Sequence, residues 1–185
     1  MAPGDLTTLA LVDAQLGLPS GNADEAVLSG LITGVSAFIA TYCQREFQVS
    51  TYSDAWDGKG ARRMAFPNWP VIAVTSLVIG GVTIPAGDPV SAPGYYTNAN
   101  TLMLNGYCFT PGFGNVQIAY QAGYATIPAD LELAAREAVI WMYRERLREG
   151  KASEAIAGET TSYRLVSLPP RAQAIVDLYR KVVPV

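Results

Sequence analysis

The chain has 185 residues, half of them hydrophobic, and a formal net charge of −3. This length suits one domain, or one domain with an elaboration, and the apolar share is sufficient for a proper core. The acidic balance argues against a free-standing DNA- or RNA-binding protein, which needs a basic surface to contact phosphates.

Two helices are expected at the start of the chain. The first runs from about Asp5 to Leu16, with Asp5 as its N-cap. The second follows Asn22, whose spacing to Glu25 is that of a reciprocal capping box. Apolar residues then recur at helical spacing to about Tyr42, which predicts a packed bundle helix.

The middle of the chain is predicted to be β-structure. From Phe47 apolar and polar residues alternate, and Asp57-Gly-Lys-Gly60 can turn the chain back through residues 62–66, which predicts a hairpin. The strands that follow should complete a small antiparallel sheet or partial barrel. Their expected ranges are 71–79, 82–84, 95–96, 101–104 and 116–120.

Helices are expected again after the strands. Pro128 suits the first turn of a long helix, about 128–149, whose small alanines would let a second helix approach closely. A polar stretch without periodicity follows at 151–162, and then a short strand-like run. Pro169-Pro170 opens a last helix, about 169–182.

These elements place the chain in the α+β class. A helical bundle over residues 1–149 would carry the antiparallel β-subdomain as an insertion at about 47–123. Residues 150–185 would form a C-terminal arm with a flexible segment, a short strand and a helix. The arm could reach a neighbouring protein or fold back onto its own bundle, and periodicity alone favours neither.

Charge is unevenly distributed along the chain. The segment before Arg45 carries four acidic residues and no Lys or Arg, whereas residues 136–185 carry nine basic and six acidic residues. In a ring of identical subunits, an acidic face of one copy could meet a basic face of the next. Solvated helix faces account for the same pattern equally well.

Catalytic and metal-binding chemistry finds little support. The sequence has no histidine, which excludes a Ser-His-Asp triad, a Cys-His pair and any histidine metal site. Cys43 and Cys108 form no CxxC pattern, and a buried free thiol is expected at Cys43. Asp54 and Asp57 flank Trp56 but match no acid/base or Ca²⁺-loop pattern. We therefore expect no catalytic, cofactor-binding or metal-binding residues.

Basic and aromatic residues of the β-subdomain are candidates for contacts with other molecules. Arg62 and Arg63 form a compact basic patch that could bind DNA phosphate or an acidic protein face. A solvated strand edge, where charge discourages stray strand pairing, is the simpler interpretation. Trp56 and Trp69 could belong to a small core or could anchor an interface.

No targeting or membrane-spanning segment is expected. The start of the chain lacks a basic region before an apolar run, and no apolar run reaches eighteen residues. We expect a soluble protein made in the cytoplasm, with no membrane partner.

Several segments together carry a resemblance to a known family. The most informative is Gln117-Ile-Ala-Tyr-Gln-Ala-Gly-Tyr124, followed by Ile127-Pro-Ala-Asp-Leu131 and a helix that ends in Tyr143-Arg-Glu-Arg146. Further matches are the segments 39–45, 56–60 and 70–78. In this order they resemble the head–tail connector (adaptor) family of tailed bacteriophages, over most of the chain from about Asn22.

The resemblance implies a structural protein of the virion, located in the head–tail neck and made in the host bacterial cytoplasm. Connectors of this family form a ring beneath the portal protein and extend the DNA channel. They provide the docking surface for the next ring, a stopper or a tail protein. The resemblance further implies a dodecameric ring of this chain, with DNA passing through the lumen without specific binding, and no enzymatic activity.

The resemblance also implies two sets of contact residues. The C-terminal arm would grip the portal, and the segment from Trp56 to Phe66 would face a neighbouring subunit or the tail side. The predicted portal-docking residues are Tyr163, Arg164, Leu165, Val166, Leu168, Ile175 and Tyr179. The predicted inter-subunit or tail-side residues are Trp56, Lys59, Arg62, Arg63 and Trp69.

Two alternatives from other classes stay open at this stage. A β-rich carbohydrate- or protein-binding module would expose Trp56, Trp69 and Tyr95-Tyr96 on one face. A carboxylate-based hydrolase would bring Asp54, Asp57 or Glu46 together in a cleft.

Overall fold

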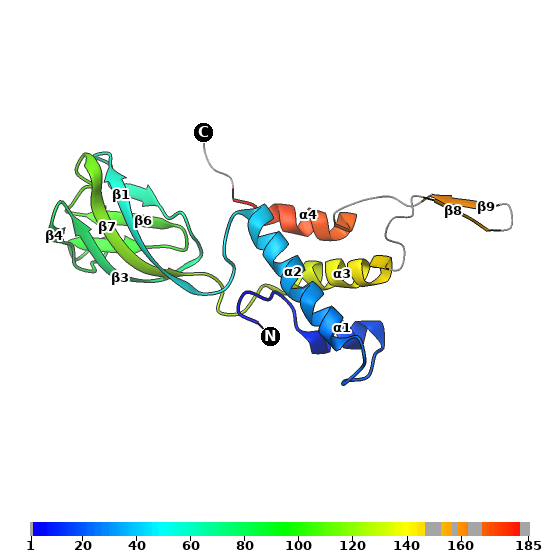
Figure 1. Ribbon diagram of the computed structural model, residues 1–185. Coiled ribbons are helices and arrows are strands. Elements are labelled where there is room, and N and C mark those ends of the chain that lie inside the picture. Colours follow the sequence, from blue (N-terminus) through cyan, green and yellow to red (C-terminus); the bar gives the residue numbers. More distant parts are fainter. Residues whose placement is uncertain (1, 147–152, 157–158, 163–167, 182–185) are drawn as a thin grey trace. The chain divides into compact units, whose positions relative to one another are not determined.

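The computed structural model describes residues 2–146, 153–156, 159–162 and 168–181. The chain divides into two compact units, which Figure 1 traces in the order of the sequence. One unit combines Met1–Arg45 with Ile127–Val185, and the other is the continuous segment Glu46–Thr126. We call them the helical unit and the β-unit. Helices together with antiparallel sheets confirm the expected α+β class.

The described part of the helical unit contains α1 (Leu9–Leu16), α2 (Glu25–Cys43), α3 (Ala129–Glu145) and α4 (Pro170–Leu178). Helix α2 packs against the three other helices, and α3 also contacts α1 and α4 (Figure 1). Ala134, Ala135 and Ala138 on α3 are fully buried. Their small side chains let neighbouring helix axes approach closely, as the sequence predicted. The predicted end of α3 near residue 149 lies outside the described residues.

The first helix starts later than the sequence predicted. Its N-cap is Thr8, whose hydroxyl accepts a hydrogen bond from the Leu11 N–H at 3.4 Å, so Asp5 is not the cap. Asp5 is buried instead, and its carboxylate accepts hydrogen bonds from the Ala2 N–H and the Thr33 hydroxyl. This buried carboxylate therefore holds the chain before α1 against α2.

The start of α2 also differs from the predicted capping box. The N-cap is Asp24, and the Asn22 side chain accepts from the backbone N–H of Asp24. The Glu25 carboxylate reaches back to the Gly21 N–H. Both side chains satisfy backbone donors at the helix start. Asn22 accepts from the residue two positions on and Glu25 from the residue four positions back, whereas a capping box spans three positions in both directions.

Helix α2 is long and apolar enough to cross a membrane by length and composition, with a mean hydropathy of 1.7 over its most apolar window. The central helix of a soluble bundle meets the same criterion. Leu28, Ile32 and Ile39 on one face of α2 are buried, and the Ser36 hydroxyl on that face accepts a hydrogen bond from the Leu6 N–H at 2.9 Å. These contacts place one face of α2 in the interior of its unit.

The last helix folds onto its own bundle. It ends at Leu178, before the predicted end near residue 182, and its Ala172 and Val176 are fully buried. The Cys43 thiol lies 3.5 Å from the Val176 carbonyl oxygen, and the Lys181 N–H donates to the Cys43 carbonyl at 3.0 Å. Cys43 is free and fully buried, so the prediction of a buried free thiol is confirmed, and burial raises the pKa of this thiol to about 11.

Two antiparallel sheets form the β-unit. The order of the four-stranded sheet is β1-β7-β3-β4, and that of the three-stranded sheet is β2-β6-β5. The strands of the first sheet are β1 (Ser50–Gly58), β7 (Gly112–Ala122), β3 (Val71–Ile79) and β4 (Val82–Thr83). Those of the second are β2 (Arg63–Ala65), β6 (Thr101–Asn105) and β5 (Gly94–Thr97).

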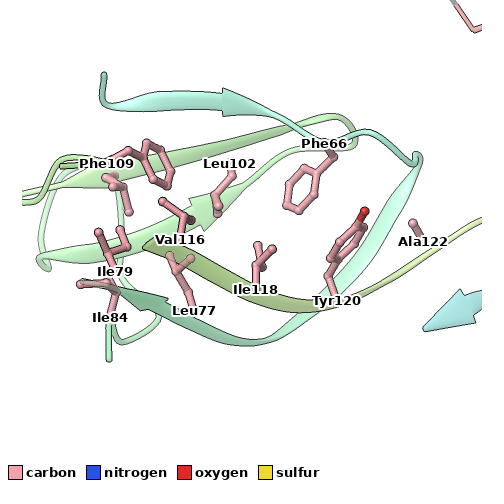
Figure 2. Close-up of a cluster of buried hydrophobic side chains, with 11 residues drawn as sticks. Phe66, Leu77, Ile79, Ile84, Leu102, Phe109, Val116, Ile118, Tyr120 and Ala122 are labelled. Carbon is pink, nitrogen blue, oxygen red and sulfur yellow. The ribbon is translucent and has the colours of Figure 1, made fainter. Parts of the chain in front are cut away.

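The core of the β-unit lies between these sheets. Figure 2 shows its buried side chains, in which Leu77, Ile118 and Tyr120 of the first sheet meet Leu102 of the second, together with Phe66 just after β2. Large branched and aromatic side chains fill this layer, as the alternating pattern of the strands requires.

The predicted hairpin over residues 47–66 is wrong. Strand β1 pairs with β7, with Ser50 opposite Ala122, whereas β2 pairs with β6 in the other sheet. The Gly58 N–H donates to the Asn115 side chain at 2.9 Å, and the Gly114 N–H donates to the Asp57 carboxylate at 2.6 Å. The turn residues at the end of β1 are therefore used in long-range contacts, and the chain crosses from one sheet to the other.

A second hairpin was not expected from the sequence. The polar segment after α3 contains β8 (Ser153–Ile156) and β9 (Glu159–Ser162), which pair antiparallel with Ser153 opposite Ser162. Ile156, Thr160 and Thr161 favour strands, but the two strands carry no alternating apolar pattern from which the sequence analysis could have predicted them.

Candidate interaction surfaces

Trp56 belongs largely to the core of the β-unit. Its half-buried ring makes edge contacts with Phe66 and Tyr120, with centroids 5.7 Å and 6.1 Å apart. Figure 2 shows Phe66 and Tyr120 side by side, and their centroids are 4.9 Å apart. Only the exposed part of the Trp56 ring is accessible to a neighbour, and the predicted interface role of this residue stays a prediction.

The carboxylates Asp54 and Asp57 are bound in separate structural contacts. The Tyr120 hydroxyl donates to Asp54 at 2.9 Å, and burial of Tyr120 raises the pKa of its hydroxyl. Asp57 accepts from the Gly114 N–H, as described above. Each carboxylate therefore takes part in a contact that holds the β-unit together. Among the residues that the structure describes, no three His, Cys, Asp or Glu side chains cluster as a metal site would require.

The basic residues of the β-unit lie on its surface. Lys59, Arg62 and Arg63 are exposed, and Arg63 belongs to β2, an edge strand of the three-stranded sheet. Charge on an edge strand discourages pairing with a stray strand. Trp69 is half-buried. The interface role predicted for Lys59, Arg62, Arg63 and Trp69 stays a prediction.

The aromatic face expected of a binding module is not formed as predicted. Tyr95 packs against the core of the β-unit, and its hydroxyl donates to the Val74 carbonyl at 3.2 Å. Trp56 is occupied by core contacts in the same way. Two members of the predicted aromatic face therefore stabilise the fold, and the geometry does not favour a carbohydrate-binding function.

The predicted portal-docking residues fall into two groups. Tyr163, Arg164, Leu165 and Val166 lie outside the described residues. Leu168 is buried at 5% exposure, Ile175 is half-buried, and the Tyr179 hydroxyl donates to the Asp130 carboxylate at 2.7 Å. This second group therefore contributes to the attachment of α4 to its own bundle.

A polar cluster adds to the attachment of α4. The Tyr42 hydroxyl and the Gln173 side-chain amide both donate to the Asp177 carboxylate, at 2.6 Å and 2.9 Å. The hydrogen bond from Tyr42 is the main cause of the lowered pKa of Asp177, and the same bond raises the pKa of Tyr42. Both directions agree with an ionised carboxylate bound to a neutral hydroxyl.

Part of the predicted charge complementarity is used within one copy. Asp24 at the start of α2 accepts hydrogen bonds from the Tyr143 hydroxyl and from Arg146, whose guanidinium lies 3.2 Å away. Arg171 on α4 lies 3.2 Å from Glu137 on α3. The Asp24–Arg146 pair therefore neutralises one acidic N-terminal charge and one basic C-terminal charge inside the helical unit. The Arg171–Glu137 pair neutralises two charges of the C-terminal part.

The sequence analysis missed one exposed feature. Phe113, at the start of β7, is 97% exposed, and the sequence analysis gave this residue no role. A bulky apolar residue between two glycines was the available signal.

An open groove of about 430 Å³ lies on the same unit. We call it the Tyr107 groove. Its lining includes Arg62, Ile79, Val82, Ile84, Tyr107 and Cys108.

The carboxylates and aromatic residues that suggested chemistry help to hold the fold together. A family model of head completion proteins matches residues 5–182. The chain therefore belongs to the head completion protein family, a structural class and not an enzyme class. This confirms the resemblance to head–tail connectors. A search of curated protein sequences finds no significant match.

Solved structures with the same fold come from phage-like particles. One chain, in the neck of an empty gene transfer agent particle computed with C6 symmetry, is 21% identical with a TM-score of 0.61. Another, in the virion of the native particle, is 18% identical with a TM-score of 0.60. A third, in the native neck computed with C12 symmetry, is 17% identical with a TM-score of 0.59. Each match covers 100% of this chain and 94% of the other.

Proposed function

We propose that this protein is a head–tail connector that forms a ring in the neck of the virion. The ring binds beneath the portal protein, extends the DNA channel and offers a docking surface to the next neck or tail component. The family match over residues 5–182 carries this proposal. The shared fold with chains from the necks of gene transfer agent particles supports the location.

The ring consists of copies of this chain, with twelve as the proposed number. The C6 and C12 symmetries used for the necks of the similar particles support a closed ring of this kind. DNA passes through the lumen without specific binding. The net charge of −3 supports this part, because a surface without excess positive charge does not retain the phosphate backbone.

The portal contact is proposed for the segment between α3 and α4. Leu168 and Tyr179 anchor α4 to the bundle, which leaves the β8–β9 hairpin and Tyr163, Arg164, Leu165 and Val166 as the portal-facing residues. A two-stranded hairpin has two outer strand edges, and such edges can add to a sheet of a partner.

Replacement of residues 153–162 by an equal number of Gly and Ser residues tests the portal contact. We expect the variant to keep the wild-type melting temperature and to lose attachment to DNA-filled heads that carry the portal. The matched control replaces the exposed loop residues 89–91 in the same way, which keeps Asp88, and we expect it to attach normally. If the hairpin variant attached as well as the wild type, the portal contact would lie elsewhere.

A further inference from the structure

Phe113 is a solvent-exposed aromatic residue on a rigid part of the β-unit. At 97% exposure it is the most exposed of the large apolar side chains in the described part of the chain. It lies where β1 ends and β7 begins, since Gly58 is opposite Gly112. Aromatic side chains in such positions are the usual anchors of protein–protein interfaces.

The segment around Phe113 is fixed by hydrogen bonds. The Asn115 amide donates to the Thr110 carbonyl at 2.7 Å, and its oxygen accepts from the Gly58 N–H at 2.9 Å. A Cβ atom at Gly58 would lie 1.9 Å from the Thr110 carbonyl oxygen, so only glycine permits this approach. The backbone that carries Phe113 is therefore preorganised, which reduces the entropy lost when the ring is bound.

The Tyr107 groove has the properties of a receptor for such a ring. Its floor is formed by Ile79 and Ile84, which are 5% and 4% exposed, and its rim by Val82 and Tyr107, which are 59% and 36% exposed. A volume of about 430 Å³ exceeds that of one phenyl ring. The groove lies beside β4 and the start of β2. Each of these strands is one of the two edge strands of its sheet.

We propose that Phe113 of one copy inserts into the Tyr107 groove of the next copy. Phe113 is not part of the groove lining and is almost fully exposed, so it does not occupy its own groove. The contact we propose is head-to-tail: each copy gives its Phe113 to one neighbour and receives the Phe113 of the other, so the contact repeats from copy to copy and can close into a ring.

Charge complementarity favours a second copy as the occupant. The Asp57 carboxylate lies next to Phe113, because it accepts the Gly114 N–H at 2.6 Å. Arg62 lines the groove and is exposed. Insertion of Phe113 therefore brings a carboxylate of one copy to a guanidinium of the next, an arrangement that favours one orientation of the contact.

This inference rests on the proposed function, because it names the contact that closes the connector ring. Two exposed residues allow a direct test in assembled particles. Cys108 lines the groove and is exposed, whereas Cys43 is buried, so Phe113→Cys would place a second accessible thiol opposite Cys108 of the next copy. An added oxidant such as diamide takes up the two electrons and two protons released when the two thiols form a disulfide.

Particles assembled with a mixture of wild-type and F113C copies, in which the wild-type copies keep the ring contact, are oxidised and separated on a non-reducing gel. We expect a band at twice the mass of this chain, which C108S in all copies abolishes. The matched control V90C places a thiol on another loop at a residue that is 90% exposed, and we expect no such band. Monomers from full necks, or a disulfide to a different neck protein, would overturn the proposal.

A second measurement counts the copies of this chain per particle for F113A and V90A. We expect at least tenfold fewer copies for F113A, an unchanged number for V90A, and wild-type melting temperatures for both. Full necks with F113A would overturn the inference while the connector function stands. Particles in which the wild-type chain is absent from the neck would instead overturn the connector function itself.

Discussion

The two units of this protein are stabilised in different ways. The helical unit joins segments from both ends of the chain, and its interior combines buried alanines with polar side chains, such as Asp5 and Ser36, that link the segment before α1 to α2. The β-unit is continuous in sequence and has a core of large side chains around Tyr120. Its polar side chains act both within turns, as Asp88 does, and between distant strands, as Asn115 does with Gly58.

This difference teaches that the two units can be perturbed separately. The β-unit should depend mainly on its large apolar core. The helical unit should depend on the correct placement of its last helix and on the charges that hold that helix. Changes made in one unit should therefore leave the melting of the other nearly unchanged, and the following substitutions test this.

The largest effect is expected from Tyr120→Ala in the β-unit. Tyr120 is fully buried, contacts Phe66, and donates to Asp54 at 2.9 Å. Removal of a buried aromatic side chain costs about 3–5 kcal/mol. Urea unfolding followed by tryptophan fluorescence in a W141F background, which leaves Trp56 and Trp69 of the β-unit as the reporters, measures the change. The control Phe113→Ala, at a fully exposed aromatic, should stay within about 0.5 kcal/mol of the wild type.

A somewhat smaller effect is expected from Val176→Asp in the helical unit. Val176 is fully buried in α4, and a carboxylate there would have no partner, which costs about 3 kcal/mol or more. Circular dichroism should show loss of helix at lower urea, while the fluorescence transition of the β-unit stays in place. Leu178→Asp is the matched control, since Leu178 is 79% exposed on the same helix. A joint shift of both transitions would show that the units are not separable.

The smallest effect is an acid-dependent change at Asp177. Because the hydrogen bond from Tyr42 lowers the pKa of Asp177 in the folded state, its contribution is present above the unfolded pKa. It is lost as the pH falls through the lower folded pKa. We expect Asp177→Asn to flatten the pH dependence of the helical transition below about pH 4.

The same acid titration distinguishes the two units. Backbone hydrogen bonds from Val90 and Ser91 lower the pKa of Asp88 in the β-unit. Asp88→Asn should therefore flatten the pH dependence of the β-transition and leave that of the helices unchanged. An identical response to both substitutions would contradict the separation of the two units.

Local patterns predicted most of the elements of this fold. The apolar stripe of α2, the alanines of α3 and the β-branched run of β3 each specify an element through short-range periodicity. Pairing between strands was harder to predict. The Asp57-Gly58 segment has the composition of a hairpin turn, yet Asn115 and Gly114, distant in sequence, take its hydrogen bonds. Long-range partners of this kind leave no mark in local sequence.

The interaction surfaces were less predictable than the fold. Trp56 is of a residue type that often anchors interfaces. It packs on Phe66 and Tyr120 instead, because its side chain lies on the face of β1 that is turned toward the second sheet. Phe113 is exposed although its residue type is usual for cores. Exposure of an aromatic residue depends on which side of the sheet it occupies, and this follows from the register of β7 with β1.

Electron cryomicroscopy of intact particles tests the central claim most directly. The connector account predicts a closed ring of this chain in the neck, directly beneath the portal, with the β8–β9 segment toward the portal and Phe113 of each copy against its neighbour. Absence of this chain from the neck, in particles that have attached their tails, would contradict the account.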